Sequence, residues 1–206
     1  MFDEAYEKLD LDETATIIEM VNKQVEGSLF DPLETTILAI DVPFYKDYRF
    51  LDIADHATKP PLQRYVLQKK GTQDFTLLDW TYKTIYDLNE KAPIELTDKN
   101  IIDYVRFFYQ FVKGRHGRFI ICESVENIHW KDEPPEEIRK ALNQVLVPFK
   151  IIEKREDGVY KMHGCMMLKD ALFKVDIYVE PNGRITMADH EILIEDIPVL
   201  DLTFGQ

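Results

Sequence analysis

The chain has 206 residues, 45% of them hydrophobic, and a formal net charge of −13 at pH 7. A chain of this length and composition can bury a core without disulfide or metal staples. Its negative charge argues against broad contact with nucleic-acid phosphates, which depends on clustered Lys and Arg.

The first element predicted along the chain is an amphipathic helix. Asp10 and Glu13 make a capping-box-like start, and Gly27 provides a stop, which predicts a helix over residues 12–26. The following region is rich in β-favouring residues and is interrupted by Pro and Gly. We expect strands there, at residues 36–42, 48–53 and 64–68.

Two further helices are predicted in the middle of the chain, after a segment at 80–96 that fits either a helix or an irregular connection. Thr97 as N-cap and Gly114 as stop delimit a helix over 98–113 that is apolar nearly all round. It could be buried in a monomer core or in a homo-oligomer interface. A second helix, over 135–146, has a single apolar stripe, which favours packing on one face of a sheet.

Residues 148–196 predict an antiparallel β-meander, because turn signals separate runs with alternating apolar residues. A three-residue loop at 181–183 pairs apolar residues only with apolar residues, whereas a two-residue loop would mix the faces. The pairs this predicts are Glu180–Arg184, Val179–Ile185, Tyr178–Thr186 and Ile177–Met187. The same logic at 156–158 predicts Ile152–Met162 and Glu153–Lys161.

A four-residue turn at 169–172 would join the two middle strands of this meander. It predicts the pairs Met166–Val175, Gly164–Ile177, Met162–Val179, Cys165–Asp176, His163–Tyr178 and Lys161–Glu180, with Ala188 beyond Asp176. The polar face would then gather a candidate pocket of His163, Cys165, Asp176 and Tyr178. A thiol, an imidazole and a carboxylate are residue types of nucleophilic catalysis, but a solvated face with a ladder of charges is the plainer interpretation.

Residues 113–118 form a second candidate site. Lys113, Arg115, His116 and Arg118 cluster around two glycines in an otherwise acidic chain, which indicates a contact for an anion or an acidic peptide. Cations at a helix C-terminus also oppose the helix dipole, and this simpler role competes with the first. No His or Cys spacing indicates a metal site, and we expect no cofactor.

The distribution of charge and cysteine bears on partner and compartment. Residues 1–34 hold ten acids and two Lys, a net charge of −8, and residues 185–206 hold five acids and no Lys or Arg. Cys122 and Cys165 have no nearby partner in the sequence, which suits a reducing compartment. We see no leader and no apolar run near the roughly 20 residues that span a bilayer, so a cytoplasmic protein without membrane contact is expected.

These observations together predict an α+β protein. The meander at about 148–196 packs against helices at about 98–113 and 135–146, and a helix and strands form the N-terminal half. We expect one compact unit over residues 1–206, with 1–92 and 93–206 as subdomains if there are two. The favoured function is a non-catalytic interaction or accessory protein that binds another protein, preferably a basic one. The alternative is a small-molecule-binding protein or enzyme with a pocket lined by Tyr104, Tyr109, His163, Asp176 and Tyr178.

Overall fold

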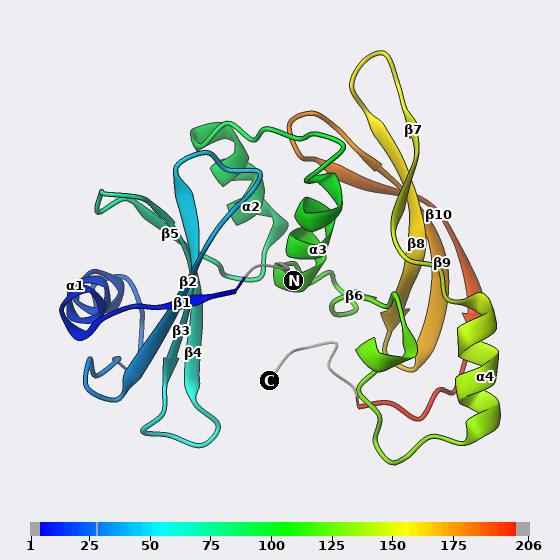
Figure 1. Cartoon of the computed structure of the whole chain (residues 1–206), viewed down its shortest axis with the longest axis horizontal. Helices are drawn as coiled ribbons and strands as arrows, with labels where there is room; N and C mark the ends of the chain where they lie inside the picture. The colour runs from blue at the N-terminus through cyan, green and yellow to red at the C-terminus, as the bar shows by residue number, and fades with distance from the viewer. Residues whose placement is uncertain (1–4, 28, 201–206) are drawn as a thin grey trace. The chain divides into compact units, whose positions relative to one another are not determined.

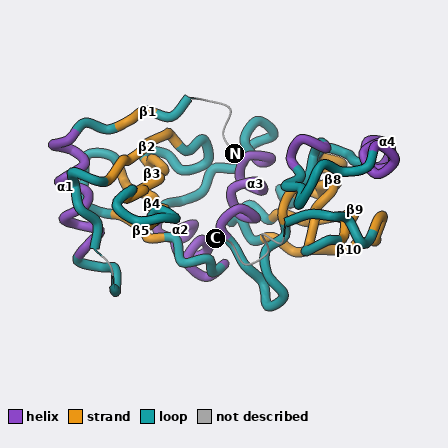
Figure 2. Tube along the Cα trace, turned by 90° about the horizontal axis from the view of Figure 1, so that it is seen from below, coloured by secondary structure: helices purple, strands orange, loops and turns teal. Residues whose placement is uncertain are grey.

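The computed structural model describes residues 5–27 and 29–200. The chain divides into two compact units, Met1–Asp79 (unit 1) and Trp80–Gln206 (unit 2). Each combines helix with an antiparallel sheet, so the α+β class and the C-terminal meander are confirmed (Figures 1 and 2). None of the described helices is long and apolar enough to cross a membrane.

The described part of unit 1 forms a five-stranded meander in which each strand pairs with its neighbour in the sequence, in the order β1-β2-β3-β4-β5. The helix α1 (Leu11–Asn22) follows the first strand. The strands are β1 (Glu7–Lys8), β2 (Thr35–Asp41), β3 (Tyr48–Asp55), β4 (Leu62–Lys69) and β5 (Phe75–Leu77). The three strands predicted here are therefore confirmed within one or two residues at each end.

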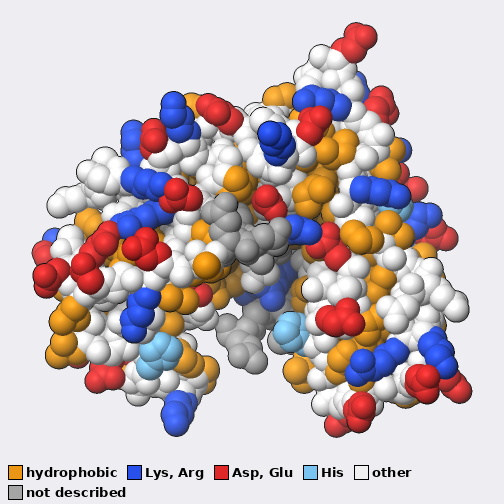
Figure 3. All heavy atoms as spheres, in the orientation of Figure 1, with side chains coloured by type: hydrophobic (Ala, Val, Ile, Leu, Met, Phe, Trp, Pro, Cys, Tyr) orange, Lys and Arg blue, Asp and Glu red, His pale blue; other side chains and the backbone are white. Residues whose placement is uncertain are grey.

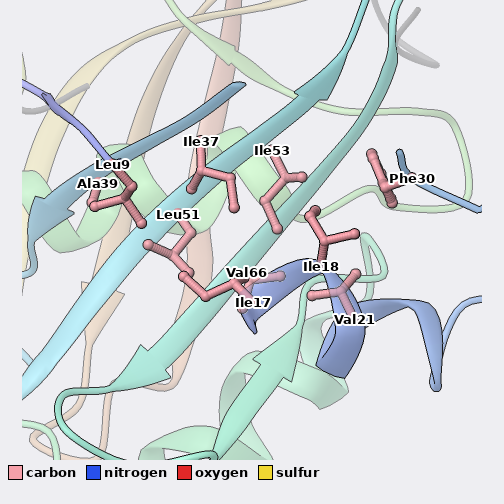
Figure 4. Close-up of a cluster of buried hydrophobic side chains, with 10 residues drawn as sticks. All are labelled: Leu9, Ile17, Ile18, Val21, Phe30, Ile37, Ala39, Leu51, Ile53 and Val66. Atoms are coloured by element: carbon pink, nitrogen blue, oxygen red, sulfur yellow. The ribbon is translucent and has the colours of Figure 1, made fainter. Parts of the chain in front are cut away.

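Helix α1 covers one face of this sheet. Its residues Ile17, Ile18 and Val21 are buried against Leu51 and Val66 of the central strands (Figure 4). Because these helix positions recur at helical spacing, one stripe of the helix is apolar and the opposite face is left to water. Acidic side chains gather over α1 in the space-filling view (Figure 3).

The two ends of α1 are held by side chains. The Asp10 carboxylate accepts a hydrogen bond from the backbone N–H of Glu13 (2.9 Å), as its N-cap position predicts. The helix ends at Asn22, earlier than predicted, because the Asn22 side chain bonds both the N–H and the C=O of Phe30 (2.9 Å each) and turns the chain back.

The described part of unit 2 contains three α-helices, a short 3-10 helix and a second five-stranded sheet. Its elements are α2 (Tyr82–Lys91), α3 (Ile101–Phe111), β6 (Ile120–Ile121), η1 (Val125–Asn127), α4 (Glu136–Val145), β7 (Lys150–Lys154), β8 (Tyr160–Leu168), β9 (Ala171–Val179) and β10 (Ile185–Ile194). The strand order is β10-β9-β8-β6, and β7 also pairs with β8. Figures 1 and 2 both show α3 and α4 on opposite sides of the sheet.

Helix α3 is the buried core helix that its composition predicts. It begins three residues later than expected, because Asn100 rather than Thr97 is its N-cap. The Asn100 side chain instead accepts a hydrogen bond from the N–H of Thr97 (2.7 Å), which places Thr97 in the preceding turn. Arg106 of α3 bonds the Glu123 carboxylate through Nη2 (2.7 Å), and the other oxygen of Glu123 accepts from the N–H of Phe149 (3.1 Å).

The β9–β10 turn is fixed by helices α2 and α3. The hydroxyl of Tyr104 donates to the carbonyl oxygen of Gly183 (2.6 Å) and accepts from the side-chain amide of Asn89 (3.0 Å). That amide also donates to the carbonyl oxygen of Asn182 (2.9 Å), and the Tyr86 hydroxyl accepts from the N–H of Ile185 (3.1 Å).

These bonds associate α2 with unit 2. The boundary between the units therefore falls at Asp79–Trp80, before α2, whereas the sequence places it at 92–93, after this helix. The single compact unit over residues 1–206 stays a prediction.

Candidate functional site

The register of β8 and β9 decides which polar side chains meet, and it differs from the prediction by two residues. His163 lies opposite Asp176, Lys161 opposite Tyr178, and Cys165 opposite Lys174. The predicted pairs Cys165–Asp176, His163–Tyr178, Lys161–Glu180, Met162–Val179, Gly164–Ile177 and Met166–Val175 are wrong. Leu168 pairs with Ala171, so the turn has two residues rather than four, and Lys169 adopts the left-handed conformation (φ 56°) that such a turn needs.

The hairpin of β9 and β10 begins as predicted and then departs at a bulge. Val179–Ile185, Tyr178–Thr186 and Ile177–Met187 are confirmed, and Glu180 donates its N–H to the carbonyl oxygen of Arg184 (2.9 Å). A shift between Met187 and Asp189 then brings Asp189, not Ala188, opposite Asp176. A bulge adds one residue to one strand and reverses the facing of the residues beyond it.

A second bulge lies in β7. Glu153 pairs with Lys161 as predicted, but Ile151 rather than Ile152 pairs with Met162. The extra residue, Ile152, is half exposed. Two residues of β7 therefore lie opposite one residue of β8 at this point. A prediction that assumes strict alternation of side chains cannot anticipate such an extra residue.

The observed register creates a charged cluster on the polar face of the sheet. Nδ1 of His163 lies 2.6 Å from Oδ1 of Asp176, and Nζ of Lys161 lies 3.2 Å from Oδ2 of the same carboxylate. An ionised carboxylate only accepts, so Nδ1 of His163 carries the proton of this bond. The bond from His163, with a further contribution from Lys161, lowers the pKa of Asp176 below its usual value.

Cys165 does not join this cluster. Its side chain is fully buried in a core with Leu142 of α4, Met167 and Leu172, so α4 covers this end of the face. Its Sγ accepts from the N–H of Val147 (3.4 Å). Burial raises the pKa of the Cys165 thiol, which leaves little thiolate at neutral pH.

The five residues of the alternative pocket do not line one cavity. His163, Asp176 and Tyr178 lie on the α4 side of the sheet, whereas Tyr104 and Tyr109 belong to α3 on the other side. The Tyr104 hydroxyl is engaged with Gly183, and burial raises the pKa values of both Tyr104 and Tyr109.

The cationic segment 113–118 is a tight turn beside Trp80. Gly114 and Gly117 pair with each other, and Nζ of Lys113 lies 4.1 Å from the centre of the Trp80 ring. Arg118 approaches the same ring (5.9 Å) and donates to the carbonyl oxygen of Gln110 (3.1 Å). Burial, and then the charge of Arg118, lowers the pKa of Lys113.

The four candidates in this turn therefore divide into two pairs. Lys113 and Arg118 are partly buried against Trp80, whereas Arg115 and His116 are exposed at the tip of the turn. The structure does not bring all four together around one point.

Sequence reasoning missed an acidic hollow beside the bulge of β10. This hollow encloses about 120 Å³ and is lined by Lys174, Val175, Asp176, Asp189, His190 and Glu191. Nζ of Lys174 lies 3.3 Å from Glu191, and Oδ1 of Asp189 accepts from the N–H of His190 (2.8 Å). The cluster Asp189-His190-Glu191 was visible in the sequence, but only the bulge reveals that Asp189 lies beside Asp176.

A larger hollow, of about 520 Å³, lies in unit 1. Two ion pairs border it, Arg49–Glu13 (2.6 Å) and Lys70–Asp41 (2.5 Å), and Arg49 also donates to the side chain of Gln68. These bonds pair two of the three acidic side chains that line the hollow, and Glu7 is the third.

Among residues 5–27 and 29–200, no group of three or more His, Cys, Asp or Glu side chains could hold a metal ion. No family model, no curated protein and no solved structure matches this chain.

Proposed function

We propose that this protein is a non-catalytic interaction protein, and that strand β10 binds an extended, basic segment of a partner protein. The observation that carries the proposal is the position of β10 at the end of its sheet, with the acidic hollow beside it. An edge strand presents backbone N–H and C=O groups that an added strand can pair with.

The exposure of β10 supports this role. Ala188, Asp189, His190, Glu191 and Ile192 are all exposed, and Ile192 retains 50% of its accessible surface. Five consecutive exposed residues are enough for a short added strand. The described residues pair β10 only with β9.

The charge around β10 supports a basic partner. Asp176, Asp189 and Glu191 lie on one face, where Lys161 and Lys174 are the neighbouring cations. No Lys or Arg occurs after Arg184, and Glu195 and Asp196 follow the strand. A Lys or Arg of an added strand would therefore meet more negative than positive charge, whereas an acidic strand would be repelled.

The bulge of β10 limits which part of the strand can pair. Bulges and charges are also common means of protecting an edge from indiscriminate aggregation. Both devices still permit a partner strand with the complementary charge along Asp189–Ile192, where the pairing with β9 is regular again. By excluding strands without the complementary charge, the bulge and the acidic residues of β10 would contribute to the specificity of binding.

A peptide-binding measurement tests the proposal. The probe is an acetylated peptide of alternating Lys and Val, compared by calorimetry with one of alternating Glu and Val. We expect binding of the first peptide alone, with an affinity that falls as NaCl is added. The variant Asp189→Lys/Glu191→Lys should weaken binding by about tenfold or more, because two attractive contacts become repulsive.

The matched control reverses two exposed acids of unit 1, Glu19→Lys/Glu26→Lys, and changes the net charge equally. If this control weakens binding as much as the β10 variant, the peptide responds only to overall charge and the β10 site is wrong. Amide chemical shifts of residues 188–192 should move on binding. Equal binding of both peptides also excludes the proposal.

The second candidate function is a small-molecule-binding protein or enzyme, which the bond between His163 and Asp176 favours. A carboxylate at Nδ1 fixes the tautomer of a histidine and leaves Nε2 as the reactive nitrogen. The side chain of His163 is 16% exposed, so a ligand would have little access to it. Hydrolysis of p-nitrophenyl acetate that is lost in His163→Ala but retained in His190→Ala would support this function.

We further propose a reducing compartment such as the cytoplasm, because two buried cysteines in a chain of 206 residues do not make the dense disulfide framework typical of small secreted domains. Mass spectrometry of the protein isolated under thiol-blocking conditions would test it.

A further inference from the structure

Cys122 and Cys165, the two cysteines of the chain, are neighbours on adjacent strands. The pairing of β6 with β8 places Ile121 opposite Met166, and the next pair in this antiparallel register is Cys122 with Cys165. The N–H of Cys122 donates to the carbonyl oxygen of Cys165 (3.0 Å), which confirms that the ladder continues through this pair. Residues directly opposite each other in a sheet project from the same face.

Both side chains enter the same buried cluster. The exposed fractions of Cys122 and Cys165 are 1% and 0%, and Leu142 of α4 belongs to the cluster. Sγ of Cys122 approaches the carbonyl oxygen of Ser124 (3.6 Å), and Sγ of Cys165 approaches that of Val145 (3.7 Å). Sγ of Cys165 also accepts from the N–H of Val147 (3.4 Å), and all of these contacts are weak, because a thiol is a poor donor and acceptor.

We propose that Cys122 and Cys165 form a reversible disulfide that joins β6 to β8. The Cα atoms of a hydrogen-bonded antiparallel pair lie about 5.5 Å apart, within the range of about 4.4–6.8 Å that a disulfide spans. The Cβ atoms of such a pair lie about 4.5–5.5 Å apart, against about 3.5–4.5 Å in a disulfide, so the bond needs side-chain rotation and a small approach of the two strands at this pair. It would close a loop that contains η1, α4 and β7.

The reaction is a thiol–disulfide exchange with a small disulfide such as oxidised glutathione. The thiolate of one cysteine attacks a glutathione sulfur and releases one glutathione thiolate. The second cysteine then loses its proton, attacks the protein sulfur of the mixed disulfide and releases the second glutathione. Two protein thiols become one disulfide while one glutathione disulfide becomes two glutathione thiols.

The environment of the pair makes this reaction slow in the folded protein. Burial, the neighbouring Cys165 and Glu123 raise the pKa of Cys122 to about 12, and burial also raises the pKa of Cys165. Cys165 is the better first nucleophile, because the N–H of Val147 donates to its sulfur. Residues 145–147 lead from α4 to β7 and lie over this sulfur, so oxidation should require their local opening.

The test compares the folded and unfolded wild-type protein in glutathione redox buffers. At equilibrium, the thiols are blocked and the fraction of the 122–165 disulfide is measured by non-reducing mass spectrometry. This fraction gives the effective concentration of one thiol for the other. We expect a value roughly 30-fold or more higher in the folded protein than in urea, the lower end of what native disulfides ordinarily contribute.

A ratio of one or less would overturn the proposal, because the fold would then not favour the bond. Loss of the folded structure on oxidation, seen as a change in tryptophan fluorescence to that of the unfolded protein, would also overturn the proposal. As controls, Cys122→Ala and Cys165→Ala should form only mixed disulfides with glutathione. By linkage, the equilibrium constant of unfolding should be lower in the oxidised than in the reduced protein by the ratio of these two effective concentrations.

Discussion

Removal of the Tyr104 hydroxyl should destabilise unit 2, and the loss can be worked out from its contacts. Tyr104→Phe deletes the donor to the carbonyl oxygen of Gly183 and the acceptor for Asn89. The site is buried, so water cannot readily replace either bond. A hydrogen bond contributes about 1 kcal/mol net, and a buried group left without its partner costs about 1–3 kcal/mol.

The expected loss is therefore about 2 kcal/mol in the free energy of unfolding. It should lie below the sum of two full penalties, because Asn89 keeps its bond to Asn182. The two tryptophans, Trp80 and Trp130, both belong to unit 2. Urea unfolding followed by tryptophan fluorescence therefore reports this unit.

Two further variants make the measurement specific. Tyr82→Phe removes a hydroxyl from a side chain that is 59% exposed, and it should change stability by less than about 0.5 kcal/mol. Asn89→Ala combined with Tyr104→Phe should cost less than the two single changes added together, because they share a bond. A loss below about 0.5 kcal/mol for Tyr104→Phe alone, or strict additivity in the double variant, would refute the reasoning.

Three other changes have definite expected outcomes. Gly164→Ala should destabilise unit 2 by about 2 kcal/mol or more in urea unfolding, because its Cβ would lie 2.4 Å from the ring of Phe149. Asn22→Ala should lower the thermal midpoint by several degrees, since about 1 kcal/mol per lost bond to Phe30 is forfeited. The Asp176 carboxylate has a lowered folded pKa, so it adds stability above its unfolded pKa and loses it as the pH falls through the folded value. Asp176→Asn should therefore be less stable than wild type at pH 7, and the difference should shrink below about pH 4.

The sequence predicted the elements of this protein better than their register. Hydrophobic periodicity was sufficient for α1, α3 and α4, because burial of a stripe decides whether a helix forms. The loop at 181–183 was predictable because Gly183 must adopt a positive φ (80°) there. The turn at Lys169 was not, because neither Lys169 nor Asp170 is a residue that marks a two-residue turn strongly.

The candidate site shows what such an error changes. A shift of two residues keeps every side chain on its predicted face, so His163 and Asp176 were rightly placed on the same side of the sheet. The shift does change which residue of β8 lies opposite each residue of β9. Asp176 therefore lies opposite His163 and bonds it, instead of lying opposite Cys165 as predicted. The facing of Cys122 and Cys165 lay beyond sequence reasoning, because β6 has only two residues and pairs across an intervening helix.

The strand order of unit 1 has a consequence for how the chain folds. Every described strand there pairs with the strand next to it in the sequence, and the connections from β2 to β5 are short loops, whereas α1 lies between β1 and β2. In unit 2, by contrast, β6 pairs with β8, so this pairing cannot form until α4, β7 and β8 have been synthesised. Low contact order favours rapid folding, and unit 1 leaves the ribosome first. Residues 1–79 can thus complete their sheet while the strands of the second sheet are still being made.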